Sequence, residues 1–215
     1  MIGLLKKDLY LIVKNFSFTY LIILIAPVFA AFSNPQDAMF IFSLMVALLF
    51  AFQITNTMAL DESAHWNQNV TAMPVTRFCE ALSKYLLAVL LSTGAAACVG
   101  VIGLIWNLAL FPIPKPSFMM YLGIRFAVVL LYGCVIIPAS YRFGTAKSRY
   151  VFMLFVFVPA GTPLVLKALH INVDLSFFYQ FNGSSLVCGM AAFLVLCMLL
   201  SLILSVSILQ HRKEC

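Results

Sequence analysis

Long apolar runs separated by short polar segments dominate the chain. Six runs come close to or exceed the roughly 20 apolar residues of a membrane-spanning helix, over about residues 17–33, 38–60, 83–111, 118–140, 150–169 and 183–209. No run alternates apolar and polar positions over the roughly ten residues of a membrane β-strand, and only helices or closed barrels satisfy the backbone in lipid. The pattern predicts an all-α integral membrane protein, a single transmembrane domain over residues 1–215 with six transmembrane helices.

The first sixteen residues carry a different pattern. Apolar side chains recur at helical spacing among lysines: Leu4, Leu5, Leu9, Ile12 and Val13 against Lys6, Lys7 and Lys14. Such a pattern is typical of an amphipathic helix that lies in the membrane interface. We expect an interfacial helix over residues 1–16, and a plain extension of the first span stays open as the alternative.

Composition agrees with the membrane assignment. Hydrophobic residues make up 64% of the chain and charged residues 9%, and the mean hydropathy is +1.07. In soluble domains, apolar residues make up about 45–50% of the chain and charged residues about 25%. A water-soluble fold of this length could not bury so much apolar surface.

Lysine and arginine set the expected orientation, because they accumulate on the cytoplasmic side of membrane proteins. With both termini inside, ten of these residues are cytoplasmic and only Lys115 and Lys167 lie near the outer face. The ten are Lys6, Lys7, Lys14, Arg77, Lys84, Arg142, Lys147, Arg149, Arg212 and Lys213. Basic residues placed this way account for the net charge of +6 without nucleic-acid binding.

Polar or helix-breaking residues inside three spans are candidates for a translocation path. Gln53 and Asn56 lie in the second span, and they either line a passage or form hydrogen bonds between helices. Arg125 in the fourth span marks a functional site or extends to the interface. Pro159 and Pro163 in the fifth span either kink the helix or break it.

Motifs for catalysis are missing. The segment nearest to a nucleotide-binding P-loop, GTAKS at 144–148, lacks the glycine before the lysine. The three histidines, His65, His170 and His211, lie in separate segments, so no metal site is expected. The chain is therefore not expected to be an enzyme or to hold a cofactor.

Residues 61–84 form the longest polar interruption of the chain, and they carry its most specific motifs. These are LDESAHW at 60–66, MPVTR at 73–77 and SKYLL at 83–87. Together with the six-span layout they resemble the permease subunits of ABC-type exporters, in the compact type-2 (type V exporter) form of bacteria. The chain departs from the pattern of that family at two places. His65 stands where the family commonly has a basic residue, and Phe78-Cys79 stand where it has a more polar pair.

The resemblance implies a bacterial plasma-membrane location and partners that supply energy. Two cytoplasmic ABC ATPase subunits would bind ATP and Mg, and a second permease copy would complete a homodimer or a related heterodimer. The cytoplasmic loop 61–82 would contain the coupling helix that contacts the ATPase. The resemblance places in this contact Asp61, Glu62, His65, Trp66, Val70, Met73, Pro74 and Arg77.

The loop residues fit such a contact physically. On a helix, Trp66, Val70 and Met73 share one side, and a buried tryptophan is a strong interface anchor. We expect Pro74 to end this helix and Arg77 to begin the next one. Asp61 and Glu62 are expected at the N-terminal side of the coupling helix, where acids favour the helix dipole. The alternative places Trp66 in the lipid headgroup region.

The sequence thus predicts an export permease for a hydrophobic or amphipathic substrate. The 20 phenylalanines and 10 methionines favour a small peptide or toxin first and a lipophilic drug second. Two other classes stay open, namely a membrane immunity or sensor protein without transport activity and an intramembrane enzyme.

Overall fold

The computed structural model describes residues 2–14, 35–64, 66, 76–109, 115–148, 150–151, 153–154 and 183–211. These residues are almost entirely helical. The long helices are α1 (Ile2–Lys14), α4 (Pro35–Ser63), α6 (Arg77–Ala109), α7 (Lys115–Phe143) and α10 (Gly183–His211). The all-α prediction is therefore confirmed for the described part of the chain.

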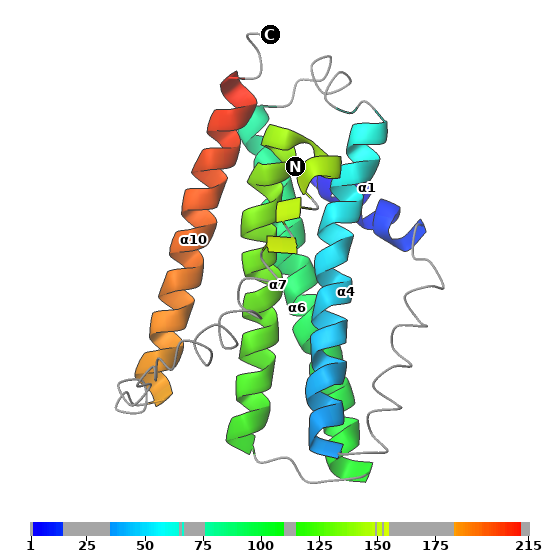
Figure 1. Cartoon of the computed structure of the whole chain (residues 1–215), viewed down its shortest axis with the longest axis vertical. Helices are drawn as coiled ribbons and strands as arrows, with labels where there is room; N and C mark the ends of the chain where they lie inside the picture. The colour runs from blue at the N-terminus through cyan, green and yellow to red at the C-terminus, as the bar shows by residue number, and fades with distance from the viewer. Residues whose placement is uncertain are drawn as a thin grey trace, which may run out of the picture.

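Helices α4, α6 and α7 form a bundle in which each contacts the other two, and α10 packs along α7 and α6 (Figure 1). The short helix α1 lies across one end of this bundle and contacts α4 and α6. At this same end α4 finishes, α6 begins and α10 finishes (Figure 1). We call it the loop-bearing end, because the connection from α4 to α6 leaves from it.

Four of the helices contain a stretch long and apolar enough to cross a membrane: Ile41–Ser63, Arg77–Leu104, Leu122–Phe143 and Gly189–His211. They correspond to the second, third, fourth and sixth predicted spans. The spans predicted over 17–33 and 150–169 lie outside the described residues, except for 150–151 and 153–154. Each of these four helices also continues a few residues beyond its predicted bounds at the loop-bearing end.

Small residues allow the central helices to approach closely. Ala47, Ala51, Ala81 and Ala88 are buried in the core between α4, α6 and α7. At Gly133 of α7, an added Cβ would lie 3.0 Å from the Cβ of Ala88, so a larger residue would require the two helices to shift slightly. Small side chains at such contacts are the usual basis of helix packing in membranes, where van der Waals contact replaces the hydrophobic effect.

A buried polar contact joins α10 to the bundle. The Tyr85 hydroxyl of α6 lies 2.5 Å from Ser201 Oγ and 2.9 Å from Ser205 Oγ of α10. Ser201 also donates to the backbone carbonyl of Cys134 in α7, at 2.5 Å. Serines spaced four residues apart face the same side of a helix, so one stripe of α10 carries these bonds.

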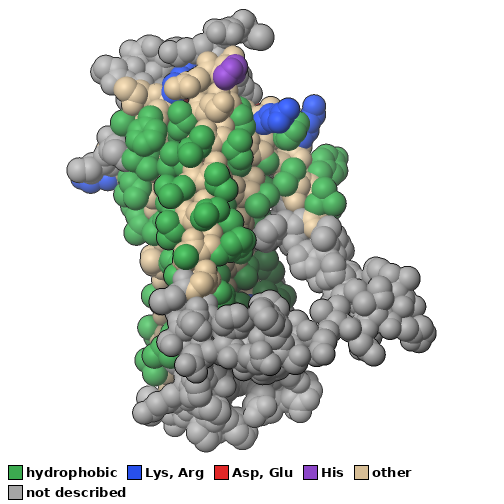
Figure 2. Space-filling model, turned by 90° about the vertical axis from the view of Figure 1, so that its left-hand side faces the viewer, with side chains coloured by type: hydrophobic (Ala, Val, Ile, Leu, Met, Phe, Trp, Pro, Cys, Tyr) green, Lys and Arg blue, Asp and Glu red, His purple; other side chains and the backbone are tan. Residues whose placement is uncertain are grey.

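Much of the remaining described surface of α10 is exposed and apolar. Phe193, Leu196, Leu200 and Ile203 are among its exposed side chains. Figure 2 looks at this side of the molecule and shows hydrophobic side chains along its length, with Lys, Arg and His gathered toward the loop-bearing end. An apolar band with basic residues at one end is the distribution expected of helices surrounded by lipid.

Candidate functional site

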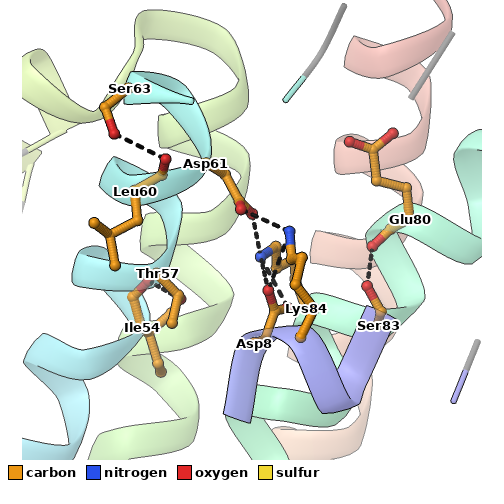
Figure 3. Close-up of polar contacts among 10 residues, drawn as sticks. Asp8, Ile54, Thr57, Leu60, Asp61, Ser63, Glu80, Ser83 and Lys84 are labelled. Atoms are coloured by element: carbon orange, nitrogen blue, oxygen red, sulfur yellow. Dashed lines mark hydrogen bonds and ion pairs between the residues drawn. The ribbon is translucent and has the colours of Figure 1, made fainter. Parts of the chain in front are cut away.

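Four charged side chains meet at the loop-bearing end and form what we call the charge cluster: Lys7, Asp8, Asp61 and Lys84. Lys84 Nζ lies 2.9 Å from both carboxylate oxygens of Asp8 and 2.5 Å from Oδ2 of Asp61. Lys7 Nζ lies 2.7 Å from Oδ1 of Asp61 and 3.4 Å from Oδ1 of Asp8. Figure 3 shows Lys84 reaching between the two carboxylates. Each cation thus contacts both anions.

Three helices supply these four side chains. Lys7 and Asp8 are the middle of α1, Asp61 lies in the last turn of α4, and Lys84 follows two turns after the start of α6. The start of α6 is fixed by Thr76, whose hydroxyl accepts a hydrogen bond from the backbone N–H of Cys79 at 3.3 Å. A threonine in this position is a typical N-cap.

The charge cluster is electrically balanced, and it is buried at Asp8 and Lys84 and partly buried at Lys7 and Asp61. Asp8 is 1% exposed and Lys84 5% exposed. Isolated charges at such depth are strongly unfavourable, whereas two cations that alternate with two anions compensate one another. The stability of the cluster therefore depends on the balance between its cations and its anions.

The cluster extends to the loop through Trp66. Lys7 Nζ lies 3.6 Å from the centroid of the Trp66 ring. An ammonium group at this distance makes a favourable cation–π contact with a tryptophan. Lys7 therefore joins the two acids of the cluster to an aromatic side chain at the beginning of the α4–α6 connection.

Glu62 points to a different partner from its neighbour Asp61. It accepts hydrogen bonds from the backbone N–H of Thr145, at 2.7 Å, and from the Thr145 hydroxyl. Gly144, just before, has a φ of +82°, and an added Cβ there would lie 2.9 Å from Glu62 Oε1. Glycine is favoured because it adopts this conformation readily and leaves space for the carboxylate. Glu62 thus connects the end of α4 to the segment after α7.

Asp61 and Glu62 lie inside α4, beyond the end predicted for the second span, and the coupling helix that they were expected to precede falls largely outside the described residues. They are part of the last turn of α4, which ends at Ser63. Carboxylates near a helix C-terminus are disfavoured by the helix dipole. The two lysines of the charge cluster and the Thr145 N–H offset this effect.

The structure describes only some of the other residues that were predicted to contact the ATPase. Arg77 begins α6, as expected, and its guanidinium lies 3.2 Å from Glu80. Trp66 is partly exposed beside Lys7. His65, Val70, Met73 and Pro74 lie outside the described residues.

The candidate path residues lie in different surroundings. Gln53 is 5% exposed, and its side-chain oxygen has no hydrogen-bond partner among the described residues. Arg125 is 3% exposed, and its Nε donates to Ser43 Oγ of α4 at 3.0 Å. Asn56 is partly exposed. Pro159 and Pro163 lie outside the described residues.

Three members of the charge cluster, Lys7, Asp8 and Lys84, were not among the candidate site residues that the sequence suggested. Asp8 carried one usable signal, since it is one of only 7 acidic residues and stands inside an apolar helical pattern. A buried acid in such a chain calls for a basic partner. The identity of that partner depends on helix packing.

The comparison with protein families decides the general class. The model of the ABC-2 family transporter proteins matches residues 3–210. The chain belongs to this family. It is therefore a multi-pass membrane protein and a permease component of an ABC transporter, a class that works with an ABC ATPase. No curated protein and no solved structure matches the chain.

Proposed function

We propose that this ABC-2 family chain is the permease subunit of an ATP-driven exporter in the bacterial plasma membrane. It crosses the membrane six times with both termini in the cytoplasm. A second permease copy and two cytoplasmic ATPase subunits complete the transporter. The loop that follows α4 contains the coupling helix, and the ATPase docks there.

The observation that carries this proposal is the way in which both ends of the loop are held. Asp61 precedes the loop and Lys84 follows it, and the two side chains form an ion pair with each other. Glu62 is bound to Thr145 beyond α7. A displacement of the loop is therefore applied to α4, α6 and α7 together, which is what a coupling element requires.

The α4–α6 connection also has the chemistry of a docking surface. Trp66 is partly exposed there, and Phe78 is exposed in the first turn of α6. Interfaces concentrate their binding energy in a few aromatic anchors that become buried on association. We assign the anchor role to Trp66, with Val70, Met73 and the ending Pro74 on the same helix.

The substrate is hydrophobic or amphipathic, and a small peptide or toxin fits best, ahead of a lipophilic drug. The mechanism is alternating access, in which closure of the ATPases displaces the coupling helix and rearranges the spans around the dimer axis. Asn56, on a partly exposed part of α4, is the best placed of the path candidates. Gln53 and Arg125 are buried between helices of one chain, so they would face a path only after these helices separate.

Co-purification tests this proposal. The tagged chain, isolated in mild detergent from its native cells, is expected to retain a P-loop ATPase and to increase its ATP turnover. Trp66→Ala should lower both retention and stimulation, whereas Trp106→Ala, which changes the other tryptophan near the far end of α6, should preserve them.

Two outcomes favour the rival classes. A chain that never retains an ATPase would support a membrane immunity or sensor protein. A chain without an ATPase that loses a measured activity on substitution of one serine or histidine, with assembly intact, would support an intramembrane enzyme.

A further inference from the structure

Positive charge is in excess on the surface of the loop-bearing end. The described acids at this end all have a partner inside the protein, namely Asp8, Asp61, Glu62 and Glu80. Four exposed cations form no ion pair with any acid that the structure describes, namely Lys6, Lys14, Arg142 and Lys147. Because the acids are already engaged, these cations make the surface attractive to an anion.

Arg142 and Lys147 flank the turn that ends α7. Together with Phe143 and Tyr150 they form what we call the basic patch, and all four side chains are exposed. The Arg142 guanidinium carbon lies 5.4 Å from the centroid of the Phe143 ring. Lys147, Tyr150 and Leu154 are spaced three and four residues apart, which places side chains on one face of a helix. The basic patch thus combines two cations with aromatic and aliphatic groups.

The turn that carries the basic patch is held by backbone and side-chain hydrogen bonds. The backbone N–H of Gly144 donates to the Ser140 carbonyl at 3.0 Å, and that of Ser148 donates to the Gly144 carbonyl at 3.1 Å. Glu62 of α4 accepts from the Thr145 N–H at 2.7 Å. The backbone between the two cations is therefore ordered before any ligand binds, which lowers the entropic cost of binding.

The basic patch lies where the polar end of the molecule meets its apolar side. Figure 2 shows Lys and Arg side chains near the loop-bearing end, with hydrophobic side chains below them. Met153 and Leu154, which follow Tyr150 in the sequence, are also exposed. In a membrane protein, cations and tyrosines at such a boundary lie at the level of the lipid headgroups. A ligand at this level meets charge on one side and hydrocarbon on the other.

An anionic phospholipid has the chemistry that matches this surface. Its phosphate accepts paired hydrogen bonds from a guanidinium group and a charge contact from an ammonium group. Its acyl chains fit beside exposed apolar side chains such as Met153 and Leu154. A water-soluble partner would match only the charged half of the surface. The combination therefore favours a lipid.

We propose that the basic patch is a binding site for the headgroup of an anionic phospholipid. Arg142 and Lys147 bind the phosphate, and Phe143 and Tyr150 lie beside the glycerol part of the lipid. Such a site requires only the membrane location of the chain and does not depend on an ATPase. Its failure would therefore leave the exporter proposal standing, and failure of the exporter proposal would leave the lipid site standing.

Thermal unfolding of the purified full chain in a non-ionic detergent tests the site. Dioleoyl phosphatidylglycerol at about 100 times its dissociation constant should raise the midpoint by about 5–10 °C, and dioleoyl phosphatidylcholine should raise it by much less. Arg142→Gln combined with Lys147→Gln should weaken the affinity for phosphatidylglycerol by about 25-fold, about fivefold for each cation. Arg142→Lys combined with Lys147→Arg, which keeps both charges, should preserve most of the affinity.

A charge-matched control comes from α1. Lys6→Gln combined with Lys14→Gln removes the same charge from two exposed positions. These lysines lie eight residues apart in one helix, about 12 Å along its axis, which is too far for both to bind one phosphate. The control should keep the phosphatidylglycerol affinity of the unaltered chain. Equal weakening in the two double variants would overturn the proposal, because the lipid would then respond to net charge alone.

Other occupants of the basic patch would give different results. Equal stabilisation of the unaltered chain by both lipids would overturn the proposal. Inorganic phosphate that stabilises the chain as much as phosphatidylglycerol would indicate a site for a free anion and not for a lipid. A chain that does not respond to phosphatidylglycerol, but loses its co-purified ATPase on Arg142→Gln with Lys147→Gln, would assign the basic patch to the ATPase.

Photolabelling locates the site without any substitution. A phosphatidylglycerol with a diazirine beside its headgroup is irradiated with the unaltered chain, and the adducts are mapped by mass spectrometry. We expect an adduct within residues 142–154 that excess phosphatidylglycerol removes and excess phosphatidylcholine does not. Adducts confined to other parts of the chain would refute the assignment to the basic patch.

Discussion

Removal of Lys84 should destabilise the chain more than any exposed lysine does. Its ammonium group contacts three carboxylate oxygens, two on Asp8 and one on Asp61. Lys84→Met removes the charge from a side chain of nearly the same length and leaves the buried Asp8 and the partly buried Asp61 with Lys7 alone. Loss of one partner from a buried ion pair costs about 3–5 kcal/mol.

The same geometry predicts that a second substitution compensates for the first. Asp8→Asn combined with Lys84→Met removes one charge of each sign and preserves the 2.7 Å pair between Lys7 and Asp61. The double variant should therefore lose less stability than the two single variants together. For residues in direct contact, such coupling is about 0.5–3 kcal/mol.

Thermal unfolding of the unaltered chain, the two single variants and the double variant, all in the same detergent, measures these stability differences. A loss of 1 kcal/mol lowers the midpoint by about 2–4 °C in a chain of this size, so Lys84→Met should lower it by about 6–20 °C. Lys14→Met, an exposed lysine at the end of α1, is the control and should change the midpoint little. Additive single effects, or equal midpoints for Lys84→Met and Lys14→Met, would refute the buried charge cluster.

Three further substitutions test other contacts. Gly144→Ala should destabilise the chain by about 1–2 kcal/mol because of its positive φ, whereas Gly123→Ala, with open space around it, should not; equal thermal midpoints would contradict this. Tyr85→Phe removes two hydrogen bonds to α10 and should lower stability by about 1–2 kcal/mol, more than Tyr10→Phe at an exposed position does in the same assay. Arg125→Ala should impair transport in whole cells more than it lowers expression, and equal losses would assign Arg125 to helix packing alone.

Helix positions followed well from the sequence. Long apolar runs ended by polar or proline-containing segments predicted α4, α6, α7 and α10 to within a few residues of most observed ends. The largest difference is at α6, which begins at Arg77 and not near residue 83. Hydropathy marks the apolar run, but the Thr76 cap sets the start of the helix.

Contacts between distant residues could not be predicted in the same way. Lys84 and Asp8 are 76 positions apart, and Arg125 and Ser43 are 82 apart. Each pair depends on the rotation of two helices about their axes, and helices that are apolar on all sides give no sequence signal for that rotation. Hydropathy likewise did not place Asp61 and Glu62 inside α4, because the helix continues through the polar residues after its apolar run.

Site-specific photocrosslinking is the most direct test of the claim that the α4–α6 loop meets an ATPase. A benzophenone amino acid is placed at Trp66 in one chain and, as a control, at Met119 in another, where an exposed side chain lies near the far end of α7. Irradiation of the native membranes should give an adduct of the chain with a P-loop ATPase from position 66 and none from position 119. An ATPase adduct missing at 66, or equally strong from both positions, would contradict the account.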